Sequence, residues 1–182
     1  MIVNNSPDSI ATLAGGCFWC LEAVYESVQG VNSVISGYMG GSAPNPHYAS
    51  VCTGTTGYAE VVQLHFDPDV IGYAQLLEIF FTIHDPATLN RQGNDCGSQY
   101  RSAIFYHDAE QLATAEEVIA HVQITLGQAI VTEVVPAVTF YPAESEHQHY
   151  FARHPDQAYC FHIIKPKVLK FRQYFPHWER KN

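Results

Sequence analysis

The sequence predicts an α/β protein, more narrowly an α+β two-layer sandwich with a ferredoxin-like βαββαβ core. Three observations support this class. The chain has 182 residues, of which 47% are hydrophobic, so one compact domain can bury a substantial core. Short β-branched segments alternate with segments of helical periodicity. Their order is that of the split βαβ motif, in which two helices cover one face of a four-stranded sheet.

The core elements follow one another in the first 106 residues. Apolar positions Phe18, Leu21, Val24 and Val28 have helical spacing and precede Gly30, which is typical of a helix and its end. Alternating or β-branched segments flanked by turn residues indicate the strands. The expected strands span residues 9–14, 31–38, 58–66 and 100–106, and the second helix spans residues 73–83.

The rest of the chain adds elements to this core. Residues 109–126 are expected to form a third helix that ends at Gly127. Residues 130–140 are expected to form an added C-terminal strand, interrupted by Pro136. A short helix is expected over residues 144–153.

We expect a single domain over residues 1–182, in which residues 154–182 form a mostly irregular C-terminal segment. The loops at residues 39–57 and 84–99 exceed the roughly 12–15 residues beyond which loops are usually functional or disordered. Both loops are therefore candidates for building a site.

Charge and cysteine content limit the expected partners and compartment. Nine Lys and Arg against 18 Asp and Glu give a net charge of −9, which argues against nucleic acid as a partner. Neither a basic leader nor an apolar stretch of about 18 residues is visible, so we expect a cytoplasmic monomer without membrane contact. The five cysteines are an odd set, which favours chemistry or burial over a structural disulfide framework.

Cys17 follows Gly15-Gly16 where a predicted strand turns into a predicted helix. Unsatisfied amides of a first helical turn stabilise an anion, so we expect them to lower the pKa of the Cys17 thiol. Cys20 lies one turn further on the same helix face, at the spacing of dithiol redox motifs. A buried, unreactive Cys17 is the alternative, and the pattern alone favours neither.

Glu60 shares strand parity with Val62, Leu64 and Phe66, which places its carboxyl on the apolar face of the sheet. Desolvation raises the pKa of a carboxylic acid, so Glu60 could stay protonated near neutral pH and donate a proton. A strand-end glutamate that reaches solvent fits the pattern equally well.

A thiolate beside a neutral acid is what reduction of a polarised S=O group requires, because sulfur attacks sulfur while a proton reaches the departing oxygen. The segment Gly15-Gly16-Cys17-Phe18-Trp19-Cys20 resembles the GCFW signature of peptide methionine sulfoxide reductase, type A. Further segments resemble the same family and extend the likeness over nearly the whole chain. They are Asn45-Pro46-His47-Tyr48, residues 52–60, His84-Asp85-Pro86, residues 93–102 and Pro142-Ala143-Glu144.

The resemblance implies reduction of the S epimer of methionine sulfoxide, free or in proteins, with Cys17 as the nucleophile and Glu60 as the acid. We expect no cofactor and no metal. The resemblance also implies that two phenols hold the sulfoxide oxygen, that two aromatic rings receive the S-methyl group and that one carboxylate lines the site. These residues are Tyr48 and Tyr100, Phe18 and Trp19, and Asp95.

The resemblance further implies that Cys17 becomes a sulfenic acid, which a second thiol converts into a disulfide that thioredoxin reduces. Cys160 resembles the family's resolving position. Cys20 is the alternative resolving thiol, near in sequence but expected to require local unwinding. The sequence departs from the commoner forms of the family at Tyr58, where His is frequent, and at Cys20 and Cys96, where other small residues often occur.

Two other functions remain open on the sequence. A general CxxC dithiol-disulfide oxidoreductase would use Cys17 and Cys20 and would leave Glu60 without a role. A protein-binding or redox-sensing module would recognise methionine through Phe18 and Trp19 without turnover.

A zinc site is disfavoured because no regular ligand spacing accompanies Cys17 and Cys20. The histidines around the predicted helix over residues 144–153 are expected to be exposed to solvent. The other candidate ligands considered are His147, His149, Cys160 and His162.

The basic tail, which includes Lys165, Lys167 and Lys170, is expected to be a solvated flank. Its docking to an acidic partner such as a thioredoxin-like reductase is the less favoured reading. The apolar residues expected to pack on the body are Val168, Leu169, Phe171 and Phe175.

Overall fold

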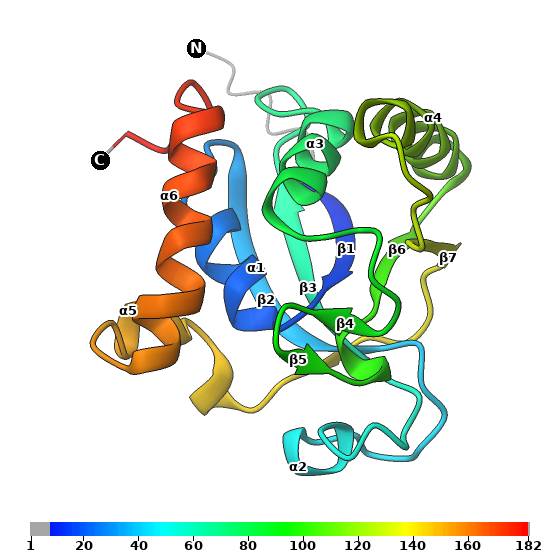
Figure 1. Cartoon of the computed structure of the whole chain (residues 1–182), viewed down its shortest axis with the longest axis vertical. Helices are drawn as coiled ribbons and strands as arrows, with labels where there is room; N and C mark the ends of the chain where they lie inside the picture. The colour runs from blue at the N-terminus through cyan, green and yellow to red at the C-terminus, as the bar shows by residue number, and fades with distance from the viewer. Residues whose placement is uncertain (1–7, 182) are drawn as a thin grey trace.

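The computed structural model describes residues 8–181 and has a mixed α/β fold around one six-stranded mixed sheet (Figure 1). The strands of this sheet are β1 (Ser9–Gly15), β2 (Val31–Met39), β3 (Ala59–Phe66), β6 (Ser102–Tyr106), β7 (Glu133–Pro136) and β8 (Tyr141–Pro142). The order across the sheet is β7-β6-β1-β3-β2-β8. The four inner strands pair antiparallel, while β7 runs parallel to β6.

Six α-helices accompany the sheet in the described part of the chain. They are α1 (Phe18–Tyr25), α2 (Tyr48–Val51), α3 (Tyr73–Ile83), α4 (Ala109–Leu126), α5 (Tyr150–Arg153) and α6 (Lys165–Tyr174). The expected order of strands and helices over the first 106 residues is present, as are the expected bounds of α3 and α4. None of the helices among residues 8–181 is long and apolar enough to cross a membrane.

The main core lies between one face of the sheet and helices α1, α3 and α6 (Figure 1). Side chains such as Leu13, Val62 and Leu64 from the strands meet Phe18 and Phe80 from the helices, and all five are fully buried. A smaller cluster, which includes Met39 and Phe105, occupies the other face and is covered by the chain that connects β7 to β8. The sheet is therefore buried on both faces, which suits the run of apolar residues in β3.

The predicted strand over residues 130–140 is wrong in its extent. Only Glu133–Pro136 pairs with β6, and the chain then crosses to the opposite edge, where β8 pairs with β2. The last bond of this pairing runs from the amide of Ala137 to the Tyr106 carbonyl of β6, at 2.8 Å, and the chain leaves the edge of the sheet after it. Two short edge strands thus replace one longer strand.

The two long loops each contain ordered structure. Helix α2 lies within residues 39–57. The loop over residues 84–99 contains the hairpin of β4 (Arg91–Gln92) and β5 (Asp95–Cys96) and leads into a 3₁₀ turn, Ser98–Tyr100. Tyr100 therefore precedes β6 rather than belonging to it. Figure 1 shows α2 and the β4–β5 hairpin near the same end of the sheet.

The prediction of a mostly irregular segment over residues 154–182 is wrong. The chain there forms a five-residue π-helix, Cys160–Ile164, that continues into α6. Val168 and Phe171 of α6 are buried in the main core, whereas Leu169, expected to pack on the body, is 51% exposed. The helical spacing of Val168 and Phe171 is enough to pack α6 against the main core, although most other residues of this helix are polar or basic.

The short helix predicted over residues 144–153 is replaced by a 3₁₀ turn, Ser145–His147, and by α5. The predicted helix is interrupted because a buried carboxylate accepts hydrogen bonds from two backbone amides at this point. Glu22 of α1 accepts the amides of His149 and Tyr150, at 2.8 and 3.1 Å, and the Ser36 hydroxyl, at 3.2 Å. His149 adopts a positive φ of 53° to present its amide in this way.

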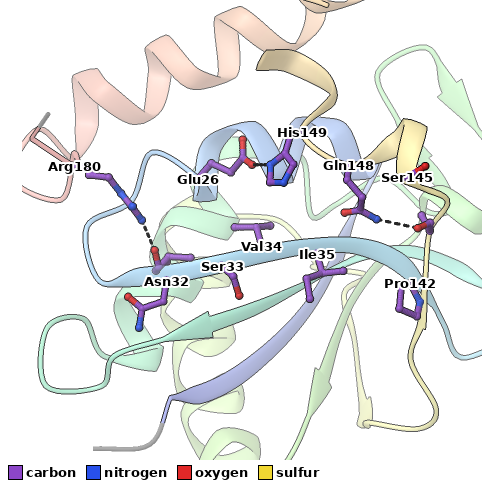
Figure 2. A pocket seen from close by; sticks show the side chains of 12 residues that line it. Glu26, Asn32, Ser33, Val34, Ile35, Pro142, Ser145, Gln148, His149 and Arg180 are labelled. Carbon is purple, nitrogen blue, oxygen red and sulfur yellow. Dashed lines mark hydrogen bonds and ion pairs between the residues drawn. The ribbon is translucent and has the colours of Figure 1, made fainter. Parts of the chain in front are cut away.

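Part of the outer edge of β2 is capped by side chains. The Gln148 carboxamide accepts the Ser36 amide at 3.0 Å and donates to the Ser36 carbonyl at 2.9 Å, as a neighbouring strand would. Further along the edge, Arg180 donates to the Val31 carbonyl. Between these two caps lies a groove of about 640 Å³, whose rim carries the contact between Glu26 and His149 (Figure 2).

Replacement of Glu22 by alanine should lower the free energy of unfolding by about 2–4 kcal/mol, because two amides and a hydroxyl would lose their buried acceptor. Urea denaturation measures this change. Glu26→Ala is the matched control, one turn along the same helix, and its loss of an exposed contact to His149 should cost less than about 1 kcal/mol. Equal effects of the two substitutions would contradict the tethering role of Glu22.

Candidate active site

Cys17 occupies the turn between β1 and α1, as the sequence predicts. Gly16 makes this turn possible, because its φ of 92° is unfavourable for other residues. A Cβ at Gly16 would also lie 2.5 Å from the side chain of Gln92. The two-glycine turn therefore lets the chain pass close to the β4–β5 hairpin and begin α1 with Cys17 as its N-cap.

The expected stabilisation of a Cys17 thiolate by the helix end is not what the structure shows. The Cys17 side chain makes no capping hydrogen bond, and the first amide of the helix, that of Phe18, donates to the Glu60 carboxyl at 3.0 Å. Burial raises the pKa of the Cys17 thiol well above its ordinary value, and the nearby Cys20 and Glu60 add to this effect. Cys17 is therefore held as a thiol in the resting site.

Cys20 lies one helical turn from Cys17 and is 1% exposed. Its interaction with the Cys17 thiol lowers the pKa of Cys20 to about 7, against the opposing effect of burial. The two thiols act as one titrating pair, in which Cys20 carries the negative charge more readily than Cys17. A proton released by Cys17 can thus pass to its neighbour.

Glu60 lies on β3 with its side chain toward the main core, and it is 1% exposed. The alternative of a solvent-exposed glutamate is therefore wrong. Burial raises the pKa of Glu60 to about 8, although the Phe18 amide partly offsets this by donating to the carboxyl. At neutral pH the site holds a carboxylic acid beside a buried thiol.

An aromatic cluster borders the two thiols. Phe18 is fully buried, and its ring centre lies 6.1 Å from that of Trp19 and 6.2 Å from that of Tyr48. His147 completes the cluster, with its ring centre 4.2 Å from that of Tyr48 and 5.6 Å from that of Trp19. The outer face of Trp19 stacks on Tyr150, at 3.7 Å and an angle of 7°.

Tyr48 owes its position to a partly buried contact with the chain after β8. Its backbone amide donates to Glu144 at 2.8 Å, and the hydroxyl of Tyr38 donates to the other oxygen of the same carboxylate at 2.8 Å. These donors lower the pKa of Glu144 against the effect of its burial. Glu144 thus ties α2 to the sheet.

Tyr100 approaches the same site from the 3₁₀ turn before β6. Burial and the carboxyl of Glu60 raise the pKa of its phenol, and the same two causes act on Tyr48. Both phenols also lower the pKa of the nearby Cys52 thiol, against the larger effect of its burial. The predicted pair of neutral phenolic donors is therefore brought into the neighbourhood of Glu60 and Cys17.

Asp95 lies on β5, where it accepts a hydrogen bond from the hydroxyl of Tyr159 at 2.8 Å. The same hydroxyl lies 4.0 Å from the Cys20 sulfur. Tyr159 also meets Trp19 edge to face, with the ring centres 5.9 Å apart. Tyr159 and Asp95 therefore form a wall beside the dithiol.

Cys160 follows Tyr159 and is fully buried at the start of the π-helix. Burial and the nearby Cys20 raise the pKa of its thiol. All five cysteines are free. The structure thus places Cys160 behind Tyr159 in an ordered helix, where a mobile segment was expected.

Three residues of this neighbourhood received no correct role from the sequence. Glu144 was part of a matching segment but not of the predicted site, and Tyr159 was not among the predicted site residues. His147 was expected to be exposed, whereas its ring packs into the aromatic cluster and burial lowers its pKa. The contacts that define these roles join residues more than 60 positions apart, so local patterns could not reveal them.

One group of three residues in the described part of the chain could bring ligand atoms within 4.8 Å of one another, namely Glu22, Glu26 and His149. None of the cysteines belongs to it. Both Glu22 oxygens already accept hydrogen bonds from the backbone, so the carboxylate acts as a tether for α5.

A buried dithiol beside a protonated carboxyl, with phenolic donors and a closed aromatic wall, defines the protein as a thiol-based oxidoreductase. A family model described as "Peptide methionine sulfoxide reductase" matches residues 9–179. The peptide methionine sulfoxide reductase MsrA of Sulfolobus acidocaldarius is 58% identical over 167 residues, which cover 92% of this chain and 95% of that protein.

Two solved structures of yeast Mxr1 resemble the fold. The reduced form from Saccharomyces cerevisiae aligns with a TM-score of 0.81 and 36% identity over 87% of this chain and 92% of that chain. Mxr1 in complex with Trx2 aligns with a TM-score of 0.58 and 28% identity over 82% of this chain and 89% of that chain. The chain therefore belongs to the peptide methionine sulfoxide reductase MsrA family, and it is an oxidoreductase that reduces methionine sulfoxide.

The raised pKa of Glu60 predicts a distinct titration. The carboxyl should keep its proton up to pH about 8, against an ordinary value of 4.5. Between these values the unfolded chain has lost the proton that the folded chain retains, so the Glu60 contribution to stability falls as pH rises.

Infrared difference spectra of wild type against Glu60→Gln measure the titration, and urea denaturation at several pH values measures the stability. The carboxyl band should titrate near pH 8, and the fall in stability should be smaller in Glu60→Gln. A midpoint close to 4.5 would show that the carboxyl is not desolvated.

Proposed function

We propose that the chain reduces the S epimer of methionine sulfoxide, free or in proteins, through attack by Cys17 on the sulfoxide sulfur. The observation that carries this proposal is the buried Cys17 and Cys20 pair facing a carboxyl whose pKa is raised to about 8. Membership of the MsrA family supports the substrate. Repair of oxidised proteins follows as the biological role.

The substrate sulfoxide oxygen would accept hydrogen bonds from Tyr48 and Tyr100, which are neutral because burial raises their pKa values. The S-methyl group would contact Phe18 and Trp19. Asp95 would line the same site, with its carboxylate engaged by Tyr159. Fixed positions for oxygen and methyl group select one configuration at sulfur.

The chemical step balances without a cofactor. As the Cys17 sulfur bonds to the sulfoxide sulfur, Glu60 donates its proton to the oxygen, and the proton released by the Cys17 thiol restores the acid form of Glu60. Oxygen then transfers to the Cys17 sulfur. Methionine leaves, and Cys17 remains as a sulfenic acid, so that one sulfur is reduced and the other is oxidised.

We propose that Cys160 resolves this sulfenic acid, with formation of a Cys17–Cys160 disulfide and release of water. Burial keeps Cys160 protonated in the resting structure, so it becomes nucleophilic only when the π-helix opens. Cys20, already beside Cys17, is the alternative resolving thiol. Its attack within one helical turn would require that turn to unwind.

Thioredoxin is the proposed reductant of the disulfide, because the related yeast Mxr1 forms a complex with Trx2. We also propose a cytoplasmic monomer that works as a single domain over residues 1–182. The strand order β6-β1-β3-β2 supports a ferredoxin-like classification of its core.

A general dithiol oxidoreductase is the second candidate, favoured only by the CxxC spacing. It gives no role to the buried acid at Glu60. Substitution of that residue separates the two functions.

Cys17→Ser should abolish formation of methionine, and Glu60→Gln should slow the sulfoxide reduction step by about 10²–10⁴-fold, because the amide cannot supply a proton. Single-turnover mixing of reduced protein with methionine S-sulfoxide measures both rates. Cys96→Ser, which removes an exposed thiol from β5, is the control and should behave as wild type. Methionine formed at the wild-type rate by Glu60→Gln would favour the general oxidoreductase.

Cys160→Ser should release about one methionine per enzyme without reductant and then stall with thioredoxin, because the sulfenic acid persists. Mass spectrometry of wild type should find the Cys17–Cys160 disulfide. Cys20→Ser is the matched comparison and should continue to cycle. Continued cycling by Cys160→Ser together with a stall of Cys20→Ser would identify Cys20 as the resolving thiol.

A further inference from the structure

A second groove, of about 620 Å³, lies on the far side of the wall formed by Tyr159 and Asp95. One side of it comes from the end of α3 and the β4–β5 hairpin. The other side comes from the π-helix and α6, which contribute His162, Lys167 and Lys170.

The groove is continuous with the thiol site through shared side chains. Tyr159 and Asp95 line it, and the Tyr159 hydroxyl is also 4.0 Å from the Cys20 sulfur. One layer of side chains therefore separates the groove from the dithiol. The charge of Lys167 acts across this layer, since it lowers the pKa of Cys20.

The cations of this groove have no ionic partners. The three salt bridges in the described part of the chain are Arg101 with Glu133, His149 with Glu26 and Arg172 with Glu179. Lys167 belongs to none of them, and the Lys170 ammonium makes only a ring contact, 6.0 Å from the centre of Tyr174.

Acidic residues on the opposite wall do not neutralise these lysines directly. Asp85 accepts the amide of Ala87 at 2.9 Å, and Asp95 accepts the hydroxyl of Tyr159 at 2.8 Å. In a chain of net charge −9, two lysine ammonium groups outside the three salt bridges form a local attraction for anions in this groove, and the charge of Lys167 also reaches Cys20.

We propose that this groove binds acidic residues that flank methionine sulfoxide in a polypeptide substrate, with Lys167 and Lys170 as the groups that recognise them. The inference rests on the proposed function. An extended chain advances roughly 3.3–3.6 Å per residue, so residues two or three positions from the methionine sulfoxide lie about 7–10 Å from it, beyond the Tyr159 wall. The groove is large enough for side chains of this kind and open to them from solvent.

The test compares two capped heptapeptides with a central methionine S-sulfoxide, one flanked by glutamates and the other by lysines. The measured quantity is the ratio of their kcat/KM values with dithiothreitol as reductant. Lys167→Gln/Lys170→Gln should lower this ratio by about five- to tenfold, since each exposed ion pair is worth roughly 0.2–1 kcal/mol. High salt should also lower this ratio for the wild-type protein, because salt screens the attraction between the lysines and the glutamates.

Lys165→Gln/Lys181→Gln is the matched control, which removes two charges from outside the groove. It should change the ratio by less than about twofold. Equal effects of the two double variants, or an unchanged ratio in Lys167→Gln/Lys170→Gln, would overturn the proposal. A raised KM for thioredoxin with an unchanged peptide ratio would overturn it too, because the groove would then serve the reductant.

Free methionine S-sulfoxide separates this inference from the proposed function. Wild type and Lys170→Gln should reduce it equally well, because it has no flanking residues. A wild type that reduces neither the free sulfoxide nor the peptides would refute the proposed function itself, whereas reduction without charge preference refutes only the role of the groove.

Discussion

The hydrogen bond from the Phe18 amide to Glu60 is the contact on which the site depends. It joins the first turn of α1 to the middle of the sheet, at 3.0 Å and without access to water. The bond fixes the acid beside Cys17. It also occupies the amide that would otherwise have stabilised a thiolate. The same interaction therefore sets the position of the Glu60 carboxyl and removes one source of thiolate stabilisation, while burial is the main cause that raises the pKa of the Cys17 thiol.

Two other carboxylates organise the site by the same means. Glu22 holds the amides of His149 and Tyr150, and so places Tyr150 against Trp19. Glu144 holds the amide of Tyr48. The first 90 residues contain no Lys or Arg, so buried acids here are satisfied by backbone amides and hydroxyls rather than by cations. The aromatic cluster is assembled from distant segments through these three anchors.

The extent to which the sequence predicts this arrangement depends on how local each feature is. Periodicity located α3 and α4 with their observed bounds, and strand parity placed Glu60 on the buried face. The environment of Cys17 could not be predicted from local patterns, because it depends on the bond from Phe18 to a carboxyl 42 residues further along the sequence. The helical structure of residues 160–174 was missed because a basic composition concealed a narrow apolar stripe, and His147 was misplaced because its partners come from α1 and α2.

The helical structure of the C-terminal segment constrains how the proposed resolving step by Cys160 can proceed. A disulfide requires sulfur atoms about 2.05 Å apart, and because Cys160 is fully buried at the start of the π-helix we expect this part of the helix to move in the proposed resolving step. Opening at Cys160 would break the bond from Tyr159 to Asp95, whereas Val168 and Phe171, which hold α6 in the main core, lie further along the chain. Breaking one hydrogen bond and exposing one buried thiol should cost about 2–4 kcal/mol. Local openings of this cost occur often enough not to limit a typical turnover of about 10 per second. Since exposure also removes the burial that keeps Cys160 protonated, the thiol becomes reactive only when it is free to move.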